Sequence, residues 1–188
     1  MAKIKLINHA GIIISSSTIN LLIDPWTEGG AFNNSWDLIS KSGDINYKEL
    51  THVWISHEHP DHFSVSDIKK IITLNSKVIF LFQHTKDKRL VNFIKKLGGT
   101  TIEKKNNEVY FFNENDYIRI IKCGSIDSLC IIKIDNKVIV NTNDCILGNE
   151  IRKLSNAIGH LRVDCLLTQF GYASFVSNKN QKLKRKNA

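Results

Sequence analysis

Short runs of apolar residues, many of them β-branched, follow one another through the start of the chain and are separated by Asn, Gly, Ser and Thr. They occupy residues 3–8, 11–16 and 19–24. β-Branched residues in short runs bounded by turn residues are typical of strands. The pattern predicts a meander of two or three antiparallel strands, followed by an irregular loop over residues 24–36.

The pattern then alternates between strand-like runs and runs with apolar residues at helical spacing. The next expected elements are a buried strand over 51–57 ending at His57, a helix over 64–75 with Ser64 or Ser66 as N-cap, a strand over 77–83 and a helix over 85–99 closed by two glycines. After them we expect five strands over 100–105, 108–113, 117–123, 128–135 and 137–143, a helix over 147–160, a last buried strand over 163–170 and the start of another helix. This order predicts a mixed α/β chain whose sheets are covered by helices.

Composition narrows the class of protein. A chain of 188 residues fits one domain or a little more, and no apolar run approaches the length of a membrane span. The N-terminus lacks the apolar core of a signal peptide, and four cysteines without CxxC spacing favour a reduced, cytoplasmic protein. The net charge of +8 favours an anionic substrate, but aromatic residues do not interleave with the basic ones, which disfavours nucleic-acid binding.

Three of the seven histidines fall within six positions, in the segment HEHPDH directly after the predicted strand. In an extended segment His57 and His59 project to the same side and can converge on one cation. Pro60 forces a turn, and Asp61 and His62 follow as a second pair. Imidazoles with a carboxylate suit zinc, iron or manganese, and two such ions share a bridging water that is a strong nucleophile. The alternative is a surface turn that happens to hold three histidines.

This H-x-H-x-D-H pattern resembles the metallo-β-lactamase superfamily, in which the motif follows a buried strand and precedes a helix. The segment GIIISSSTINLLIDPW is similar to the opening hairpin of the family, which ends in an Asp-Pro turn. The segment KVIVNTNDC is similar to the later strand that supplies an Asp bridging both metals, and Asp144 is the matching residue. The resemblance covers essentially the whole chain and implies an αββα sandwich.

Other segments narrow the resemblance. NHAGIII with LLIDPWTEGGAFNNSW is similar to the branch of L-ascorbate-6-phosphate lactonase and N-acylphosphatidylethanolamine phospholipase D. AFNNSW, NTNDC and LLTQFGYASF resemble the β-lactamase-like domain of CMP-N-acetylneuraminate hydroxylase and its bacterial relatives. That hydroxylase also has a Rieske iron–sulfur domain, whose C-x-H and C-x-x-H pair does not occur here. This chain alone is therefore not expected to carry that oxygen chemistry.

The chain departs from the family pattern in two places. The turn KCGSIDS lacks the third histidine of the first metal, and Asp127 or Cys123 is the candidate substitute. The last histidine of the family follows the final helix, whereas His160 is the last histidine here and precedes the last strand. We therefore expect a sandwich whose second half is truncated, with the missing segment absent or supplied by another chain, and an exposed edge that favours self-association.

The resemblance implies that His57 and His59 hold one metal, that Asp61 and His62 hold the second, and that Asp144 lies between them. His9, Asp127 and His84 are candidates for lining the site. Asp24 is interpreted as a turn residue before a proline, and the aromatic residues of the following loop are interpreted as packing, namely Trp26, Phe32 and Trp36.

The resulting prediction is a metal-dependent hydrolase that forms a single domain over residues 1–188, incomplete at its C-terminus. It would use one or two divalent ions, with zinc first and iron or manganese as alternatives. A metal-bound hydroxide would attack a phosphoester, lactone or amide of a small anionic substrate, and Asp61 would orient or deprotonate the water. The alternative is a non-catalytic or accessory domain that acts with a partner subunit or as a homo-oligomer.

Overall fold

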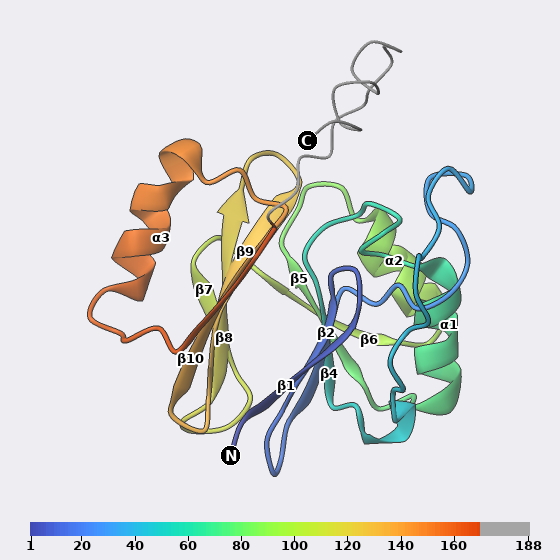
Figure 1. The fold of residues 1–188 in the computed structure, drawn as a ribbon, viewed down its shortest axis with the longest axis horizontal. Coiled ribbons are helices and arrows are strands. Elements are labelled where there is room, and N and C mark those ends of the chain that lie inside the picture. Colours follow the sequence, from blue (N-terminus) through green and yellow to red (C-terminus); the bar gives the residue numbers. More distant parts are fainter. Residues whose placement is uncertain (170–188) are drawn as a thin grey trace, which may run out of the picture.

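The computed structural model describes residues 1–169 and contains two β-sheets with helices on their outer faces (Figure 1). The first sheet has six strands in chain order, antiparallel from β1 to β3 and parallel from β3 to β6. The predicted opening meander is therefore confirmed. The six strands are β1 (Lys3–Asn8), β2 (Gly11–Ser15), β3 (Asn20–Ile23), β4 (His52–Ile55), β5 (Ile79–Gln83) and β6 (Thr100–Lys104).

The second sheet has five strands in the order β11-β10-β9-β8-β7. All neighbours are antiparallel except β10 and β11, which run parallel because the helix α3 (Ile151–Ile158) connects them. The five predicted strands after residue 100 are confirmed, with the first in one sheet and the other four in the second. The strands of this sheet are β7 (Glu108–Phe111), β8 (Tyr117–Cys123), β9 (Asp127–Ile134), β10 (Lys137–Asn143) and β11 (Cys165–Thr168).

Alternation of side chains along β4 explains why both faces of the first sheet are apolar. Val53 and Ile55 pack under the helices α1 (Val65–Leu74) and α2 (Arg89–Lys96), whereas Trp54 packs between the two sheets. Successive residues of a strand point to opposite faces, so a strand covered on both sides is apolar throughout. All three residues are almost completely buried, as the sequence predicts for this strand.

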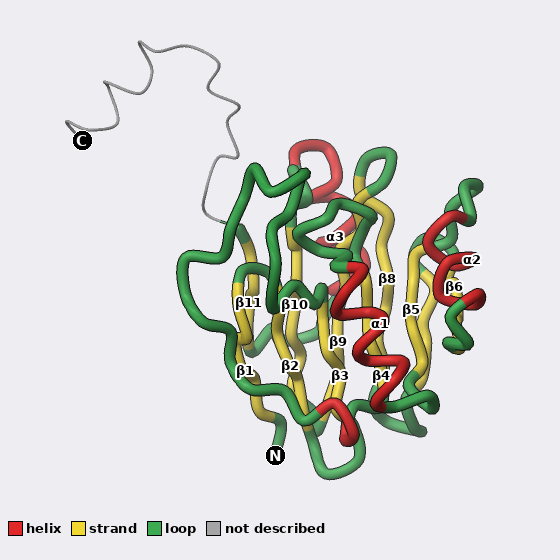
Figure 2. The backbone as a smooth tube through the Cα atoms, turned by 90° about the vertical axis from the view of Figure 1, so that its right-hand side faces the viewer, coloured by secondary structure: helices red, strands yellow, loops and turns green. Residues whose placement is uncertain are grey.

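Helix α3 covers the outer face of the second sheet, where Leu154 packs among Ile131 and Val140. The order of layers is therefore α1 and α2, the first sheet, the second sheet and α3, as Figures 1 and 2 show from two sides. This arrangement confirms the predicted αββα sandwich. No helix in the described part of the chain is long and apolar enough to cross a membrane.

Some predicted boundaries differ from the structure. Helix α2 begins at Arg89 rather than near residue 85, because the Asp87 carboxylate accepts the Arg89 backbone N–H at 2.9 Å and so caps the helix there. A 3-10 turn, Gly148–Glu150, precedes α3. Strand β11 was expected to be buried, but Leu166 is 58% exposed because this strand lies at the edge of its sheet. The helix expected after residue 170 lies outside the described residues.

The carboxyl ends of several strands meet at one end of the sandwich. β3, β4 and β5 run parallel, so the residues that follow them lie along one edge of the first sheet. Ligands of open α/β sheets bind outside the carboxyl ends of the strands. This geometry brings the segment after β4, which carries three histidines, next to Asp24 at the end of β3.

Candidate metal centre

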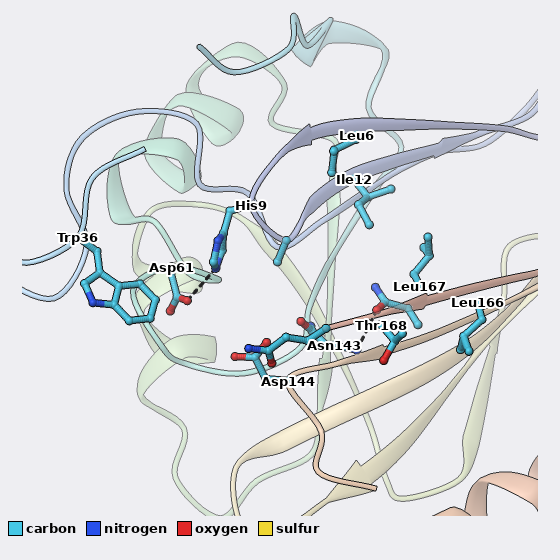
Figure 3. A pocket seen from close by; sticks show the side chains of 13 residues that line it. Leu6, His9, Ile12, Trp36, Asp61, Asn143, Asp144, Leu166, Leu167 and Thr168 are labelled. Carbon is cyan, nitrogen blue, oxygen red and sulfur yellow. Dashed lines mark hydrogen bonds and ion pairs between the residues drawn. The ribbon is translucent and has the colours of Figure 1, made fainter. Parts of the chain in front are cut away.

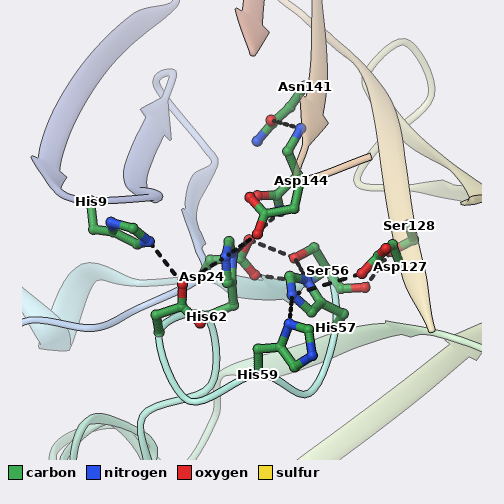
Figure 4. Close-up of polar contacts among 12 residues, drawn as sticks. His9, Asp24, Ser56, His57, His59, His62, Asp127, Ser128, Asn141 and Asp144 are labelled. Carbon is green, nitrogen blue, oxygen red and sulfur yellow. Dashed lines mark hydrogen bonds and ion pairs between the residues drawn. The ribbon is translucent and has the colours of Figure 1, made fainter. Parts of the chain in front are cut away.

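The loop between β4 and α1 holds three histidines close together (Figure 4). His57 Nε2 lies 2.9 Å from His59 Nδ1, and the rings of His57 and His62 are 4.2 Å apart. His57 and His62 are buried, whereas His59 is exposed. The loop is fixed at its far end by Ser64, which caps α1 by accepting the Asp67 backbone N–H, as the sequence indicates. The turn is therefore a folded cluster and not a mobile surface stretch with three histidines.

Two carboxylates approach the buried His62 from different elements. His62 Nε2 lies 3.2 Å from Asp144 Oδ2 and 3.4 Å from Asp61 Oδ2. Neither contact has hydrogen-bond geometry, and Asp61 Oδ1 is also buried without a hydrogen-bond partner among the described residues. Buried polar atoms without partners are costly, and several of them converging on one point are typical of a site that takes a ligand.

Two triplets of donor atoms result from this convergence. One consists of His57, His62 and Asp144, and the other of His9, Asp61 and His62; within each triplet the donor atoms lie within 4.8 Å of one another. Imidazole nitrogens and carboxylate oxygens suit divalent zinc, iron or manganese. The residues present therefore fit a divalent cation, and His62 belongs to both triplets.

The charges of this cluster are strongly coupled. Burial alone would lower the pKa of His62, but contacts with Asp144, Asp24 and Asp61 outweigh burial and raise the pKa to about 12. Burial, the largest single influence, would raise the pKa of Asp61 and Asp144, yet in both carboxylates the pKa is lowered, and His62 is the strongest of the groups that lower it. The pKa of His57 is lowered by burial and by the nearby His62. A cation that binds here takes the place of a proton on the imidazoles.

Asp24 is a functional residue that the sequence interpretation missed. Its fully buried carboxylate accepts hydrogen bonds from the Ser56 backbone N–H at 2.8 Å, the Ser56 hydroxyl at 2.7 Å and His62 Nδ1 at 3.0 Å, and also from the Asn143 amide. A carboxylate that binds one ring nitrogen fixes the orientation of the other. Asp24 thus directs His62 Nε2 toward Asp61 and Asp144. The signal was an Asp followed by Pro at a strand end, which also fits a simple turn.

Three residues around this cluster have left-handed backbone conformations, which residues other than glycine adopt uncommonly, although Asn, Asp and His adopt them more often than the rest. The φ angles are 47° at His9, 42° at Asp24 and 50° at Asn143. Such conformations persist where the surrounding structure imposes them, and they concentrate at functional sites. Here each places a side chain at the cluster: His9 contacts Asp61, and Asn143 contacts Asp24.

The structure distinguishes between the two residues that were proposed to replace the third histidine of the first metal. Asp127 and Cys123 are paired across the β8–β9 hairpin. Asp127 Oδ1 lies 3.8 Å from His57 Nε2, whereas Cys123 Sγ lies 3.9 Å from the Ile146 carbonyl. Asp127 is therefore the residue that the fold brings to the histidines.

The remaining candidates occupy different places. His9 Nε2 lies 3.0 Å from Asp61 Oδ2, which brings the β1–β2 turn to the cluster. His84 lines a separate cavity that His57 also lines. His160 lies exposed in the turn after α3, away from the two donor triplets.

A cavity of about 560 Å³ opens beside the cluster (Figure 3). Three members of the donor triplets line it, namely His9, Asp61 and Asp144. We call it the apolar pocket, because its other walls are mainly Leu6, Ala10, Ile12, Trp36, Leu166 and Leu167. Trp26 is buried, as the packing role predicted from the sequence requires, whereas Trp36, for which packing was also predicted, is 38% exposed and lines the apolar pocket.

Comparison with known proteins agrees with this architecture. The model of the β-lactamase superfamily domain matches residues 3–131. Cytidine monophosphate-N-acetylneuraminic acid hydroxylase of Danio rerio is 26% identical over 156 residues, which cover 78% of this chain and 26% of the hydroxylase. The chain thus spans about a quarter of the length of that relative.

Solved structures show the same fold at low sequence identity. A possible metal-dependent hydrolase of Veillonella parvula superposes with a TM-score of 0.68 at 16% identity, covering 99% of this chain and 80% of the hydrolase. Isothiocyanate hydrolase from Delia radicum gut bacteria gives a TM-score of 0.67 at 15% identity, covering 100% of this chain and 80% of that hydrolase. Because the family model matches well over half of the residues, the chain belongs to the β-lactamase superfamily and has the metallo-β-lactamase fold.

Proposed function

We propose that this chain is a metal-dependent hydrolase that cleaves a phosphoester, lactone or amide bond in a small anionic substrate. The observation that carries the proposal is the pair of donor triplets that share His62 and place His9, Asp61 and Asp144 at the wall of the apolar pocket. The two triplets place several metal ligands beside a cavity of a size that holds a small molecule. Structural relatives named as hydrolases share the fold.

The protein ligands come from three segments of the chain. In this proposal His57, His59 and Asp127 hold one cation, Asp61 and His62 hold the other, and Asp144 lies between them. Zinc is the first choice, and the three carboxylates also suit iron or manganese. When bound, the divalent cation polarises the bond to be cleaved and activates water for attack.

Asp61 has a further role as the residue that orients the attacking water. Its Oδ2 accepts a hydrogen bond from His9, while its Oδ1 has no partner among the described residues and is available as an acceptor. Because its pKa is lowered, Asp61 is ionised and is a weak base. It therefore holds and directs the water rather than removing its proton permanently.

Asp24, Ser56 and Asn143 act as positioning residues. Ser56 ties the end of β4 to both sheets, because its hydroxyl donates to Asp24 and its carbonyl accepts the Ser128 hydroxyl at 2.6 Å. Asn143 brings the end of β10, and with it Asp144, against Asp24. Such contacts hold ligands from both sheets at fixed separation, which catalysis by a metal centre needs.

The proposal is tested by measuring metal per chain with elemental mass spectrometry, next to a His57→Ala/His59→Ala variant. We expect one to two equivalents of zinc, iron or manganese in the protein, for which the two triplets supply donor atoms, and loss in the variant of at least the equivalent held by His57 and His59. A screen of phosphoesters, lactones and amides with the loaded protein then identifies the reaction. The matched control is His52→Gln, which changes a histidine on the same strand outside the cluster. Absence of bound metal after reconstitution, with the fold intact by circular dichroism, would refute the proposal.

A second candidate is an accessory domain that acts with a partner subunit. The observation that favours it is the coverage of the hydroxylase relative, of which this chain matches only 26%. Loss of turnover with retained metal, and recovery of turnover on adding a partner, would support this alternative.

The cytoplasmic location and the single domain over residues 1–188 stay predictions. All four cysteines lie in the described part of the chain and are free thiols.

A further inference from the structure

A second cavity of about 540 Å³ adjoins the metal centre and has a different character from the apolar pocket. Ser56 and His57 line it, together with the end of β5, the loop that leads to α2 and the β8–β9 turn. We call it the basic pocket, because Lys86, Arg89 and Lys122 line it. Among the described residues that line the apolar pocket there is no lysine or arginine.

The basic pocket has an excess of positive charge. Its two acidic residues, Glu58 and Asp87, are both paired with Arg89; Arg89 Nη2 lies 3.2 Å from a Glu58 carboxylate oxygen, and Arg89 Nε bonds Asp87. Lys86 and Lys122 form no ion pair within residues 1–169. Two lysine ammonium groups are therefore available to an anion.

Gln83 is the polar group of this pocket that lacks partners. It is only 5% exposed, and neither its carboxamide oxygen nor its nitrogen has a hydrogen-bond partner among the described residues. Phe82 packs under the helices, so Gln83 faces the opposite side of β5, toward the second sheet, next to Ser56. Buried carboxamides are normally hydrogen-bonded, so an unpaired one at a cavity wall indicates a ligand that is not present.

A comparison of the ends of the three parallel strands β3, β4 and β5 shows that the unpaired side chain of Gln83 is an exception. Asp24 after β3 and Ser56 after β4 have their polar atoms bonded to each other and to neighbouring residues. Gln83 occupies the corresponding place at the end of β5 and bonds nothing within the described residues. The same edge of the sheet thus holds two residues that organise the metal centre and one whose donor and acceptor are both unused.

We propose that the basic pocket binds one arm of the substrate. This arm has a negative charge and an amide-type group, in which an N–H donor lies beside a carbonyl acceptor. The carboxylate or phosphate of this arm pairs with Lys86 and Lys122. The Gln83 N–H donates to the carbonyl oxygen of the amide-type group, and the Gln83 oxygen accepts its N–H. That this arm belongs to the substrate rests on the proposed function, but binding of the arm itself does not need a metal.

The test compares two probes of equal length and charge. Succinamate has a carboxylate and a primary amide, and levulinate replaces the NH₂ of that amide by a methyl group. Binding of each to the full chain, with and without zinc, is followed by the ¹⁵N backbone amide resonances of the residues that line the basic pocket and, where Gln83 is present, by its side-chain amide resonances. We expect saturable binding with and without zinc, and a preference of about three- to tenfold for succinamate, the value of one hydrogen bond.

Variants separate the contributions of the hydrogen bonds and of the charge. Gln83→Leu removes the unpaired polar atoms with little change in volume, so we expect it to fold and to lose the preference for succinamate. Lys122→Gln is expected to weaken both probes equally. Lys69→Gln makes the same charge change on the exposed face of α1 and is expected to weaken neither.

Several outcomes would overturn the proposal. These are unresponsive Gln83 resonances, equal preference in the wild type and Gln83→Leu, or binding that requires zinc, which would place the probe on the metal. Such a failure is distinguishable from failure of the proposed function, because metal content is measured separately and does not involve Gln83. Retained probe binding in a protein that holds no metal would support the proposed subsite and refute the proposed hydrolase function.

Discussion

The two ends of β4 carry histidines with opposite surroundings. At its start, His52 Nδ1 lies 2.9 Å from the Thr51 hydroxyl and His52 Nε2 lies 3.1 Å from the Tyr110 hydroxyl of the second sheet. Each ring nitrogen has one neutral partner. Beyond its end, His57 Nε2 faces a nitrogen of His59 at 2.9 Å and a carboxylate oxygen of Asp127 at 3.8 Å.

Burial lowers the pKa of both histidines, so burial by itself does not distinguish them. At His52 burial is the sole cause and every polar atom is paired, which is what a structural histidine between two sheets requires. At His57 other ionisable groups add to burial, and unpaired polar atoms lie nearby. The difference indicates that an excess of ionisable groups over neutral partners marks a ligand site.

The largest expected effect concerns the end of β4 at the candidate metal centre. Asp61→Ala removes the unpaired Oδ1 acceptor and one ligand of the His9–Asp61–His62 triplet. We expect turnover of the best substrate to fall by about 10²- to 10⁴-fold, the usual contribution of such a group. Initial rates of hydrolysis measure this, with circular dichroism to verify the fold. His52→Gln, at the other end of β4, should keep the wild-type rate; an active Asp61→Ala protein would remove the assigned role.

An intermediate effect is expected at the residue that organises the centre. Asp24→Asn keeps the size of the side chain but turns an NH₂ group toward donors on His62 or Asn143. We expect metal affinity to fall about 10- to 100-fold and the free energy of unfolding to fall by about 1–3 kcal/mol. Competition with a chelator and denaturant unfolding measure the two quantities. Unchanged affinity together with lower stability would assign Asp24 to folding alone.

The smallest effect is expected at the structural end and depends on pH. Burial lowers the pKa of His52 from 6.5 to about 4, so between these values the unfolded chain binds a proton that the folded chain does not. The free energy of unfolding should therefore fall as the pH decreases from about 6.5 to about 4, by on the order of 1–2 kcal/mol.

His52→Gln isolates this contribution. The glutamine keeps a polar group for Tyr110 but has no proton to gain, so the stability difference between the two proteins should change with pH only in that window. Denaturant unfolding of both proteins from pH 7 to pH 4 measures the difference, in which the titration of the metal centre cancels. A difference that does not vary with pH would show that His52 is not buried as a neutral ring.

Much of the fold was predictable from the sequence, because a strand or helix is encoded by neighbouring residues. The apolar run 53–55 of β4 and the apolar spacing at Ile68, Ile71 and Ile72 of α1 mark their elements directly. The predicted start of α2 was wrong by several residues. The hydrogen bond from the Arg89 backbone N–H to the Asp87 carboxylate sets the start of the helix, and apolar spacing does not reveal such a contact.

The candidate centre was predictable only in part. The segment from His57 to His62 is contiguous, so its spacing alone indicated ligands, and the family resemblance added Asp144. The sequence left Asp127 and Cys123 as alternatives, because both belong to the same turn and only their contacts in the folded chain separate them. Gln83 gave no signal, since what sets it apart is its lack of partners in the folded chain.

The sequence by itself determined the order and type of the elements and the histidine segment, because these depend on periodicity and spacing within short stretches. The αββα layers were implied by the family resemblance and not by the periodicity. Only the tertiary structure decided that Asp24 orients His62, that His9 reaches Asp61 and that two pockets of different charge adjoin the centre. Those contacts join residues more than thirty positions apart in the chain. They exist because the packing of two sheets brings strand ends together, and no local pattern encodes that packing.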